Sequence, residues 1–480
     1  METAKKHLQL IDAGTEVSTQ EKAFLVHGAR KFPINAECAS KYSLHFRYAD
    51  DNQLADSNQP VNLLIQNNAD SLEVGPCRIL TGSDLNGYTG RLVFCDNVYD
   101  IPCLLRDKKV VKLQSAFDDL EHIQERKSSI RSCFKEYTSD LVYDLSVYKK
   151  VFDDLDAHYR DEPEDVRESI QKAIINSEGH KFIRFFHEKV EELNHLVRGF
   201  NQKEHQAHGF YFRRQLWHII LCCALMARTN LKPRGYAGDS EMMKMIYLDD
   251  YRGDTTFCKL MQKYTVSVPA AQSVRNRRTL IMDMLQKFRE KNHIRPPGKL
   301  RVLSVACGPA FEIADILVAP RDFDTYHFTL LDQDPRALKD ADAFIYDIEK
   351  NSGARVQKEY LNMSVRLMLA TAPPLNNLGT YHFIYSMGLF DYLSTPAAKG
   401  VIEKLYRMLA PGGEMVIGNF HLSNPSKYFM EYWGDWYLIH RTEDEFKNLL
   451  PETTAADISI IFENTGSQMF LDIKKPKNCP

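Results

Sequence analysis

Residues 300–317 constrain the fold of this chain more than any other segment. They read LRVLSVACGPAFEIADIL, which is an apolar run typical of a buried strand, then a turn of small residues, then a helical pattern. Gly308 lies in the turn, where a residue without Cβ lets the backbone approach a ligand closely. This order of strand, turn and helix is typical of a nucleotide-binding βα unit. Because Pro309 and Ala310 follow the single glycine, the turn lacks the glycine series that cradles a diphosphate.

Two later segments agree with this interpretation. A predicted strand at 326–331 is followed by Asp332, about 24 residues after Gly308, near the spacing at which an acidic side chain reaches a ribose hydroxyl. In residues 408–420, MLAPGGEMVIGNF, a helix ends at a Pro-Gly-Gly turn and a buried strand follows. A glycine turn, a ribose acid and a late Pro-Gly-Gly turn in this order resemble a class I S-adenosylmethionine-dependent methyltransferase domain.

Changes in periodicity divide the chain into three predicted parts. Residues 1–115 alternate short β-type runs with Asn, Asp and Gly turns and predict a small β domain, with strands at 42–48, 61–66, 78–81 and 90–95. Residues 116–292 place apolar side chains three and four apart, which predicts a helical region. The sequence RPPG at 295–298 breaks the chain before the predicted nucleotide-binding domain at 293–480.

The last part alternates strands with helices. Strands are expected at 301–306, 326–331, 354–360, 381–386, 414–420, 458–463 and 468–473. Five βα units followed by a hairpin predict an α/β fold with a doubly wound, seven-stranded sheet that has one reversed strand at its edge.

Composition excludes some classes of function. The 61 basic and 64 acidic residues give a formal net charge of −3, so no overall field draws the chain to nucleic acid or to an anionic membrane. The N-terminus has no apolar core of signal-peptide length, and the longest apolar run, 217–227, is too short to span a bilayer. The ten cysteines show no C-x-x-C spacing, which favours reduced thiols. We therefore expect a cytoplasmic protein.

In an open α/β sheet, a ligand binds beyond the carboxyl ends of the strands, where the strand order switches. Asp332 would there accept from ribose hydroxyls, Gln333 or Met363 would flank the adenine, and 386–388 would line the methionine end of the donor. Asn362 would bond the amino edge of the adenine. The alternative is that Asn362 and Ser386 only cap the helices that follow them. The predicted cofactor contacts are Ala306, Gly308, Pro309, Asp332, Gln333, Asn362, Met363, Ser386 and Gly388.

Cys307, beside the glycine turn, has two interpretations. It could act as a nucleophile, but small residues at such a turn usually serve packing beneath a ligand, and we favour that role.

Two further segments are unusual. Residues 233–247, PRGYAGDSEMMKMIY, hold Tyr236 in a glycine-rich turn, with Asp239 or Ser240 placed to cap a Met-rich helix. The turn is either a connector or a lid over the ligand. Residues 419–442, NFHLSNPSKYFMEYWGDWYLIHRT, are dense in aromatic side chains and contain Glu431 and Arg441. They are either core or the wall of an apolar acceptor pocket.

Histidines and glutamates gather on the predicted helices between 180 and 208. Glu192 and His195 meet the Glu-x-x-His spacing of a di-iron site, but the sequence holds no second, symmetric copy. We expect a solvated polar face and no metal.

The motifs together carry a closer resemblance. With SVACGPAFE, LLDQDPRAL, IYSMGLFDYLS, MLAPGGEMVIGNF, FMEYWGDWYLIHRT and PRGYAGDSEMM, the chain resembles a bacterial methyltransferase family associated with making 3-hydroxypalmitic acid methyl ester, over about residues 205–475. The resemblance implies S-adenosylmethionine as the donor, a small, lipid-like acceptor and a helical extension that brings GYAGD to the site. Independently of the resemblance, a homo-oligomer stays an open expectation. The β domain resembles a degenerate PilZ-type barrel, but it lacks the R-x-x-x-R signature, which argues against cyclic di-GMP as its ligand.

The chemistry of the acceptor decides which residues matter. A fatty carboxylate has a pKa near ~4.3 and is ionised at neutral pH. It therefore needs a side chain that binds and orients it, but no general base. Arg441 or Arg234 could bind the carboxylate through charge-assisted hydrogen bonds, with Tyr236 as a second donor. Glu431 would matter for a hydroxyl or amine acceptor, which has to lose a proton. The catalytic candidates are thus Tyr236, Glu431 and Arg441.

Three hypotheses remain open. The first is a methyltransferase acting on a carboxylate or hydroxyl of a fatty-acid-like metabolite, and the second is one acting on a protein or on another metabolite. The third is a regulatory protein that only senses the cofactor, with the β domain as its output.

Overall fold

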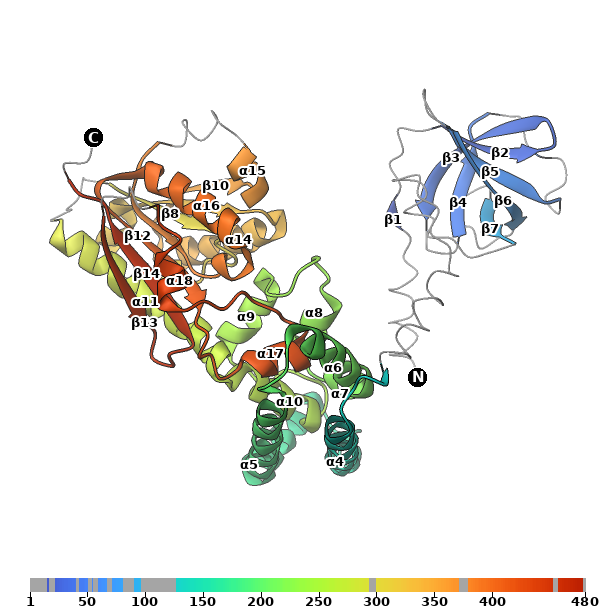
Figure 1. Cartoon of the computed structure of the whole chain (residues 1–480), viewed down its shortest axis with the longest axis horizontal. Helices are drawn as coiled ribbons and strands as arrows, with labels where there is room; N and C mark the ends of the chain where they lie inside the picture. Colours follow the sequence, from blue (N-terminus) through green and yellow to red (C-terminus); the bar gives the residue numbers. More distant parts are fainter. Residues whose placement is uncertain are drawn as a thin grey trace. The chain divides into compact units, whose positions relative to one another are not determined.

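The computed structural model contains two compact units, Met1–Ser129 and Ile130–Pro480 (Figure 1). The predicted helical region and the predicted nucleotide-binding domain share the second unit. The predicted boundary at 295–298 and residues 116–126 lie outside the described residues. The structure describes residues 15–16, 22–39, 43–50, 54, 59–66, 71–80, 90–95, 127–292, 299–370, 379–451 and 456–477.

The first unit is a small β-barrel. All its strand pairs are antiparallel, and the order β1-β3-β2-β5-β6-β7-β4 closes because β3 also pairs with β4. Alternate side chains such as Leu25, Leu44, Phe46 and Leu92 fill the interior. The small β domain is present, and the strands β2 and β3 were not predicted. The strands are β1 (Thr15–Glu16), β2 (Lys22–His27), β3 (Arg30–Ala39), β4 (Ser43–Tyr48), β5 (Val61–Gln66), β6 (Ser71–Leu80) and β7 (Gly90–Phe94).

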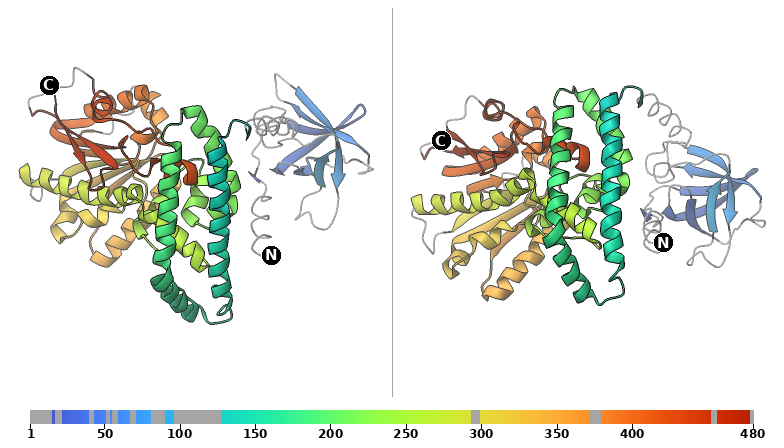
Figure 2. Two further views of the ribbon diagram at one scale, coloured as in Figure 1. Left: turned by 60° about the horizontal axis from the view of Figure 1, so that its bottom comes forward. Right: turned by 90° about the horizontal axis from the view of Figure 1, so that it is seen from below.

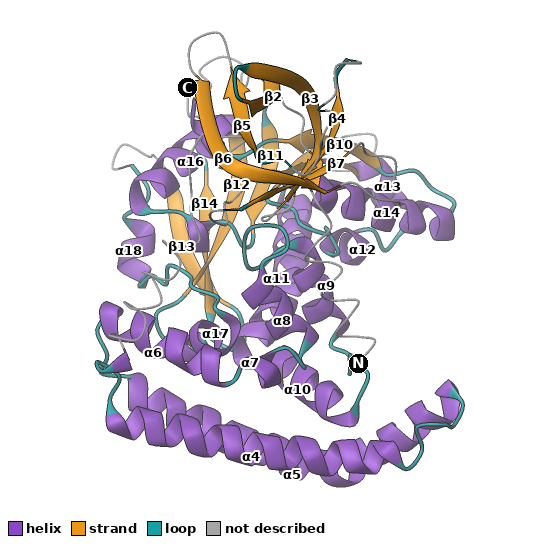
Figure 3. Cartoon of the chain, turned by 90° about the vertical axis from the view of Figure 1, so that its right-hand side faces the viewer, coloured by secondary structure: helices purple, strands orange, loops and turns teal. Residues whose placement is uncertain are grey.

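Helices open the second unit. The apolar residues of α4, three and four apart, face those of α5, and Figures 2 and 3 show the two long helices side by side. Their shared core, which includes Phe134, Phe182 and Phe186, continues into the shorter helices and into α17 (Lys427–Gly434). The helices are α4 (Ser132–Ala157), α5 (Glu164–Val197), α6 (Gln202–Gln215), α7 (Trp217–Ile220), α8 (Ala224–Leu231), α9 (Ser240–Leu248), α10 (Thr256–Ser267) and α11 (Pro269–Lys291).

A seven-stranded sheet in the order β10-β9-β8-β11-β12-β14-β13 completes this unit. The first five strands run parallel, and β14 is antiparallel to both of its neighbours. The reversed strand was predicted at the edge, and this detail is wrong, because the chain enters the edge strand β13 first and returns through β14 beside β12. The strands are β8 (Leu300–Val305), β9 (Tyr326–Asp332), β10 (Gln357–Asn362), β11 (Tyr381–Ser386), β12 (Leu409–Phe420), β13 (Asp457–Phe462) and β14 (Gln468–Lys474).

Helices cover both faces of this sheet. The core on one face includes Leu285 of α11 and Ile345 of α14, and the core on the other includes Val401 of α16 and Phe446 of α18. This mixed sheet between two helical layers has the architecture of a doubly wound α/β fold. The remaining elements are α12 (Glu312–Ile316), α13 (Pro320–Thr325), α14 (Pro335–Ser352), α15 (Val365–Ala370), η2 (Phe390–Tyr392), α16 (Thr395–Met408) and α18 (Glu443–Lys447).

The strand order switches between β8 and β11. From β8 the chain adds β9 and β10 on one side, and from β11 it adds β12 on the other. The carboxyl ends of β8 and β11 therefore meet at the position where such sheets bind ligands. Among the helices that the structure describes, none is long and apolar enough to cross a membrane.

Candidate active site

The turn after β8 has an unusual backbone. Ala306, Gly308 and Ala310 have φ angles of 55°, 56° and 53°, a left-handed conformation that only glycine adopts cheaply. A Cβ built on Gly308 would meet nothing within 4 Å, so the turn faces open space on that side. Backbone strain of this kind is typical of ligand-binding turns.

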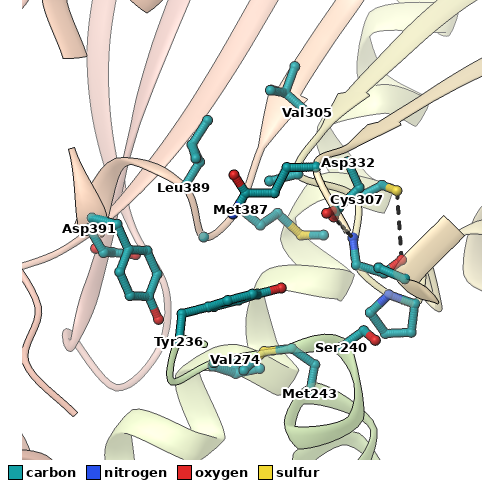
Figure 4. A pocket seen from close by; sticks show the side chains of 18 of the residues that line it. Tyr236, Ser240, Met243, Val274, Val305, Cys307, Asp332, Met387, Leu389 and Asp391 are labelled. Atoms are coloured by element: carbon teal, nitrogen blue, oxygen red, sulfur yellow. Dashed lines mark hydrogen bonds between the residues drawn. The ribbon is translucent and has the colours of Figure 1, made fainter. Parts of the chain in front are cut away.

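Asp332, the last residue of β9, ties this turn to the next strand. Its Oδ2 accepts a hydrogen bond from the Gly308 N–H at 2.9 Å (Figure 4). Its Oδ1 accepts from the Asp334 N–H at 2.9 Å. Burial raises the pKa of the Asp332 carboxyl, while these two backbone donors favour its ionised form. The glycine turn and the predicted ribose acid are therefore in direct contact.

A cavity of about 230 Å³ opens beside this contact, at the ends of β8, β9 and β11. Most of its lining is apolar, and Figure 4 shows Val305, Met387 and Leu389 on the sheet side with Met243 and Val274 on the helix side. Eight of the twelve predicted site residues line it: Tyr236, Ala306, Gly308, Pro309, Asp332, Gln333, Met363 and Gly388.

Two of the predicted cofactor contacts hold strand ends together and do not line the cavity. The Asn362 Nδ2 donates to the carbonyl oxygens of Asp332 and Gln333, both at 3.0 Å. The Ser386 Oγ donates to the Val305 carbonyl oxygen at 2.9 Å. Both side chains thus donate between strand ends, and at the start of α15 the Leu367 N–H donates to the Ser364 Oγ at 3.1 Å.

Glu431 and Arg441 also lie outside the cavity lining. Glu431 is buried on α17, pairs with the Lys427 Nζ at 3.0 Å, and has its pKa raised by burial. The Arg441 guanidinium is buried and donates to Asn419 Oδ1 and to the carbonyl oxygens of Phe390 and Leu393, which fixes the η2 turn. In these positions both residues support the structure.

The turn at 233–239 closes one side of the cavity. Gly235 and Gly238 have φ angles of 86° and 84°, which strongly favours glycine at both positions. A Cβ on Gly238 would lie 2.3 Å from the Tyr392 Oη, so the close approach of the turn to η2 also requires glycine. The Tyr392 hydroxyl donates to the Ala237 carbonyl oxygen at 3.0 Å and accepts from the Trp436 Nε1 at 2.8 Å.

Tyr236 reaches from this turn across the cavity, toward the side where Cys307 and Asp332 lie (Figure 4). Burial raises the pKa of its hydroxyl, and nearby Asp332 adds to the rise, so the group remains a hydrogen-bond donor at neutral pH.

The charged side chains of the turn are already engaged. The Arg234 guanidinium donates to Ser240 Oγ at 2.6 Å and to Asp334 Oδ2 at 2.9 Å. Asp239 caps α9 through the Met242 N–H and pairs with the Arg228 Nε at 2.7 Å. Arg234 thus joins the turn to the start of α14 and is not free to grip an acceptor.

Asp391 is a cavity residue that the sequence did not single out. It is buried in η2, and its Oδ1 accepts from the Phe420 N–H at 2.6 Å. Burial raises the pKa of this carboxyl to about 7, against the opposing effects of the Phe420 N–H and the Arg277 charge. Its signal in the sequence was an acid five positions beyond the last residue of β11, Ser386. Arg277 of α11 also lines the cavity, and nothing near it in sequence marked it.

Cys307 lines the cavity, but burial raises the pKa of its thiol well above the usual value, which disfavours the thiolate that a nucleophile needs.

Within the described part of the chain, no three His, Cys, Asp or Glu side chains lie close enough to hold a metal ion. Two of the helix histidines bond to tyrosine hydroxyls, His187 to Tyr264 at 3.2 Å and His205 to Tyr432 at 3.1 Å.

No protein-family model and no curated protein matches this sequence. Several solved structures are similar to it in part. A possible exported protein from Bordetella parapertussis is 17% identical over 50% of this chain and 79% of its own, with a TM-score of 0.37. Magnesium protoporphyrin IX methyltransferase from Synechocystis PCC 6803, with bound SAH, is 11% identical over 43% and 86%, with a TM-score of 0.32. The N-methyltransferase NodS from Bradyrhizobium japonicum WM9 is 15% identical over 41% and 96%, with a TM-score of 0.28.

Proposed function

We propose that this chain is an S-adenosylmethionine-dependent methyltransferase. One observation carries the proposal: the strained turn at Gly308 and the carboxylate of Asp332 meet at the switch point, beside a cavity. The backbone at Gly308 can approach a ligand closely, and Asp332 can accept from ribose hydroxyls. The absence of a glycine series fits a nucleoside without phosphates.

We further propose a small acceptor with an apolar body, such as a fatty-acid-like metabolite used in signal or secondary-metabolite synthesis. The lining supports this, because apolar side chains such as Met243, Val274 and Leu389 surround a few polar groups. A folded protein would have to insert a side chain into the same cavity, whereas a small molecule can enter whole.

The transfer itself is a displacement at the methyl carbon. An oxygen of the acceptor forms the new bond to the methyl group, the carbon–sulfur bond breaks, and its electron pair neutralises the sulfonium. In-line alignment of the three atoms can supply on the order of 7 to 11 kcal/mol. Tyr236 would orient the acceptor oxygen through its hydroxyl. A carboxylate acceptor needs no base, whereas a hydroxyl acceptor would give its proton to Asp391, whose pKa is near neutrality.

Calorimetry with S-adenosylhomocysteine tests the cofactor proposal. The Asp332→Ala variant should bind more weakly by about 1 to 3 kcal/mol, because charge-assisted hydrogen bonds are lost. Asp324→Ala, which changes an exposed residue of α13, is the matched control and should bind like the wild type. If the wild-type protein binds neither the donor nor its product, the proposal is wrong.

The acceptor class needs a separate experiment. The pure protein is incubated with methyl-labelled donor and a bacterial extract, and the label is followed into lipid, protein and polar fractions. Label in the lipid fraction is expected, and label in protein would replace the small-molecule proposal. Donor binding without any transfer would identify a cofactor sensor.

A further inference from the structure

Arg277 is buried against the cavity without a full set of partners. Its side chain is 6% exposed, and it lines the cavity from helix α11. The Nη1 donates to the Met387 carbonyl oxygen at 3.1 Å, the Nη2 donates to the Met243 sulfur at 3.3 Å, and the guanidinium also interacts with the buried Tyr247 hydroxyl. The Nε has no hydrogen-bond partner. A thioether is a weak acceptor, so part of the donor capacity of this buried cation is unused.

Other arginines of the same helix differ in this respect. Arg275 donates to the carbonyl oxygens of Ile246 and Val266, and Arg289 pairs with Asp322 at 2.6 Å. Arg278 pairs with Asp315 at 2.9 Å. Arg275 also pairs with Asp249 at 3.5 Å, so each of these arginines has a carboxylate partner, whereas among the described residues no carboxylate forms an ion pair with Arg277.

The acids near Arg277 each accept a hydrogen bond from another group. The Asp391 Oδ1 accepts from the Phe420 N–H, and the Glu312 Oε1 accepts from the Tyr385 hydroxyl at 2.8 Å. Burial raises the pKa of both carboxyls, and the charge of Arg277 only partly opposes the rise. A buried guanidinium without an anionic partner is costly, and a ligand carboxylate entering the cavity would remove that cost.

We propose that Arg277 is a carboxylate-binding residue of the cavity. The inference rests on the proposed function, which offers two sources for this carboxylate: the methionine part of the donor, and an acid acceptor. The position favours the donor, because the Arg277 Nη1 lies 3.3 Å from a Cβ built on Gly388, in the segment expected at the methionine end. Tyr236 and Asp391 then remain to serve the acceptor.

A pair of ligands that differ by one group tests this. S-adenosylhomocysteine carries the carboxylate, and S-adenosyl-3-thiopropylamine lacks only that group. Binding of both is measured by calorimetry for the wild type, Arg277→Met and Arg277→Lys. If the donor is the source, Arg277→Met should weaken S-adenosylhomocysteine about ten- to a hundredfold and leave the decarboxylated ligand unchanged, with Arg277→Lys in between.

The second ligand also reports folding, because it needs the adenosine site but not Arg277. Arg289→Met is the matched control, since it removes a paired guanidinium from the same helix away from the cavity lining. It should leave the ratio of the two affinities as in the wild type.

A second experiment tests whether the acceptor supplies the carboxylate that Arg277 binds. With S-adenosylhomocysteine saturating, dodecanoate and dodecan-1-ol are titrated into the wild type and Arg277→Met. If the acceptor supplies the carboxylate, the affinity for S-adenosylhomocysteine is unchanged, and only the wild type prefers the acid, by at least about tenfold.

Two results would overturn the inference. One is an equal loss of both adenosine ligands in Arg277→Met, which would identify a structural arginine. The other is unchanged affinity for all ligands. If the wild type binds neither adenosine ligand, the proposed function fails first, and the two failures are thus distinguished.

Discussion

Two segments of the chain carry its most distinctive sequences, and the structure uses them differently. The turn with Tyr236, in 233–247, lines the cavity, and both of its glycines have positive φ angles. The aromatic segment 419–442 lies mainly in the core that the helices share, where Trp433 is fully buried. Three of its residues line the cavity: Phe420, Trp436 and Leu438.

The difference has a physical cause. Trp433 packs edge to face against Phe186 and Phe212, with ring centroids 5.0 and 4.9 Å away, so the helical region needs it to fill space. The turn, in contrast, is held by its backbone and its neighbours, which leaves the Tyr236 ring free to face a ligand. The dense aromatic segment therefore serves mainly packing, whereas the single tyrosine in the glycine-rich turn lines the cavity.

The largest expected effect is on the aromatic segment. Trp433→Ala should lower the free energy of unfolding by about 3 to 5 kcal/mol, because it leaves a large cavity in the core. Urea denaturation measures this, with Tyr236→Ala, a partly exposed aromatic, as the control that should lose far less. A Trp433→Ala variant that kept its stability and lost only turnover would show that this tryptophan belongs to the site. The aromatic segment would then not serve mainly packing.

Asp391 ties η2 to the aromatic segment, because its side chain accepts a hydrogen bond from the Phe420 N–H and its carbonyl oxygen accepts one from the Ile439 N–H. The pKa of its side chain gives a pH signature. The folded-state pKa, about 7, lies above the usual aspartate value, so this carboxyl favours the folded state at low pH and loses that effect as the pH rises to 7. Relative to the wild type, Asp391→Asn should therefore gain roughly 2 to 4 kcal/mol of stability between about pH 4 and pH 7.

Denaturation of both proteins across this pH range checks the expectation. Asp315→Asn, at a partly exposed ion pair with Arg278, should show a much flatter difference. A pH-independent difference for Asp391→Asn would mean that the carboxyl titrates normally. The same variant should also lower turnover if the acceptor is a hydroxyl.

Tyr236 tests the other side of the comparison. Tyr236→Phe keeps the ring and removes the hydroxyl, so kcat should fall about ten- to thirtyfold, equivalent to about 1.4 to 2 kcal/mol, while cofactor affinity stays nearly unchanged. Steady-state kinetics and calorimetry separate the two effects. Loss of affinity instead would place the hydroxyl on the donor. If both Tyr236→Phe and Tyr236→Ala kept the turnover and the cofactor affinity of the wild type, the turn would be only a connector.

The smallest effect is expected at Glu431. Because this carboxyl pairs with Lys427 away from the cavity lining, Glu431→Gln should keep turnover within about twofold of the wild type, less than about 0.5 kcal/mol in transition-state free energy. Initial rates at saturating donor measure this. A loss comparable to that of Tyr236→Phe would show that the aromatic segment also takes part in the reaction.

Local sequence predicted most of the sheet. The strand before Gly308 and the acid at the end of the next strand correspond to elements of the structure, since these signals depend on neighbouring residues. The Pro-Gly-Gly sequence was predicted as a turn before a strand at 414–420, and this is wrong, because it lies within β12, which already begins at Leu409. The position of the reversed strand was wrong, because local periodicity finds β13 and β14 but does not say which of them lies beside β12. Arg277 was missed for a related reason: nothing within its own helix tells that it faces a cavity.

The sequence by itself determined the glycine turn, the acid that meets it and the glycines that flank Tyr236, because backbone conformation and strand ends are set by the residues present there. The tertiary structure decided which polar side chains reach the ligand space. Asn362, Ser386, Glu431 and Arg441 are satisfied by partners within the protein, whereas Asp391 and Arg277 face the cavity from a turn and a helix distant in sequence. A buried polar group takes whichever partner folding brings near, and only the assembled chain supplies that partner.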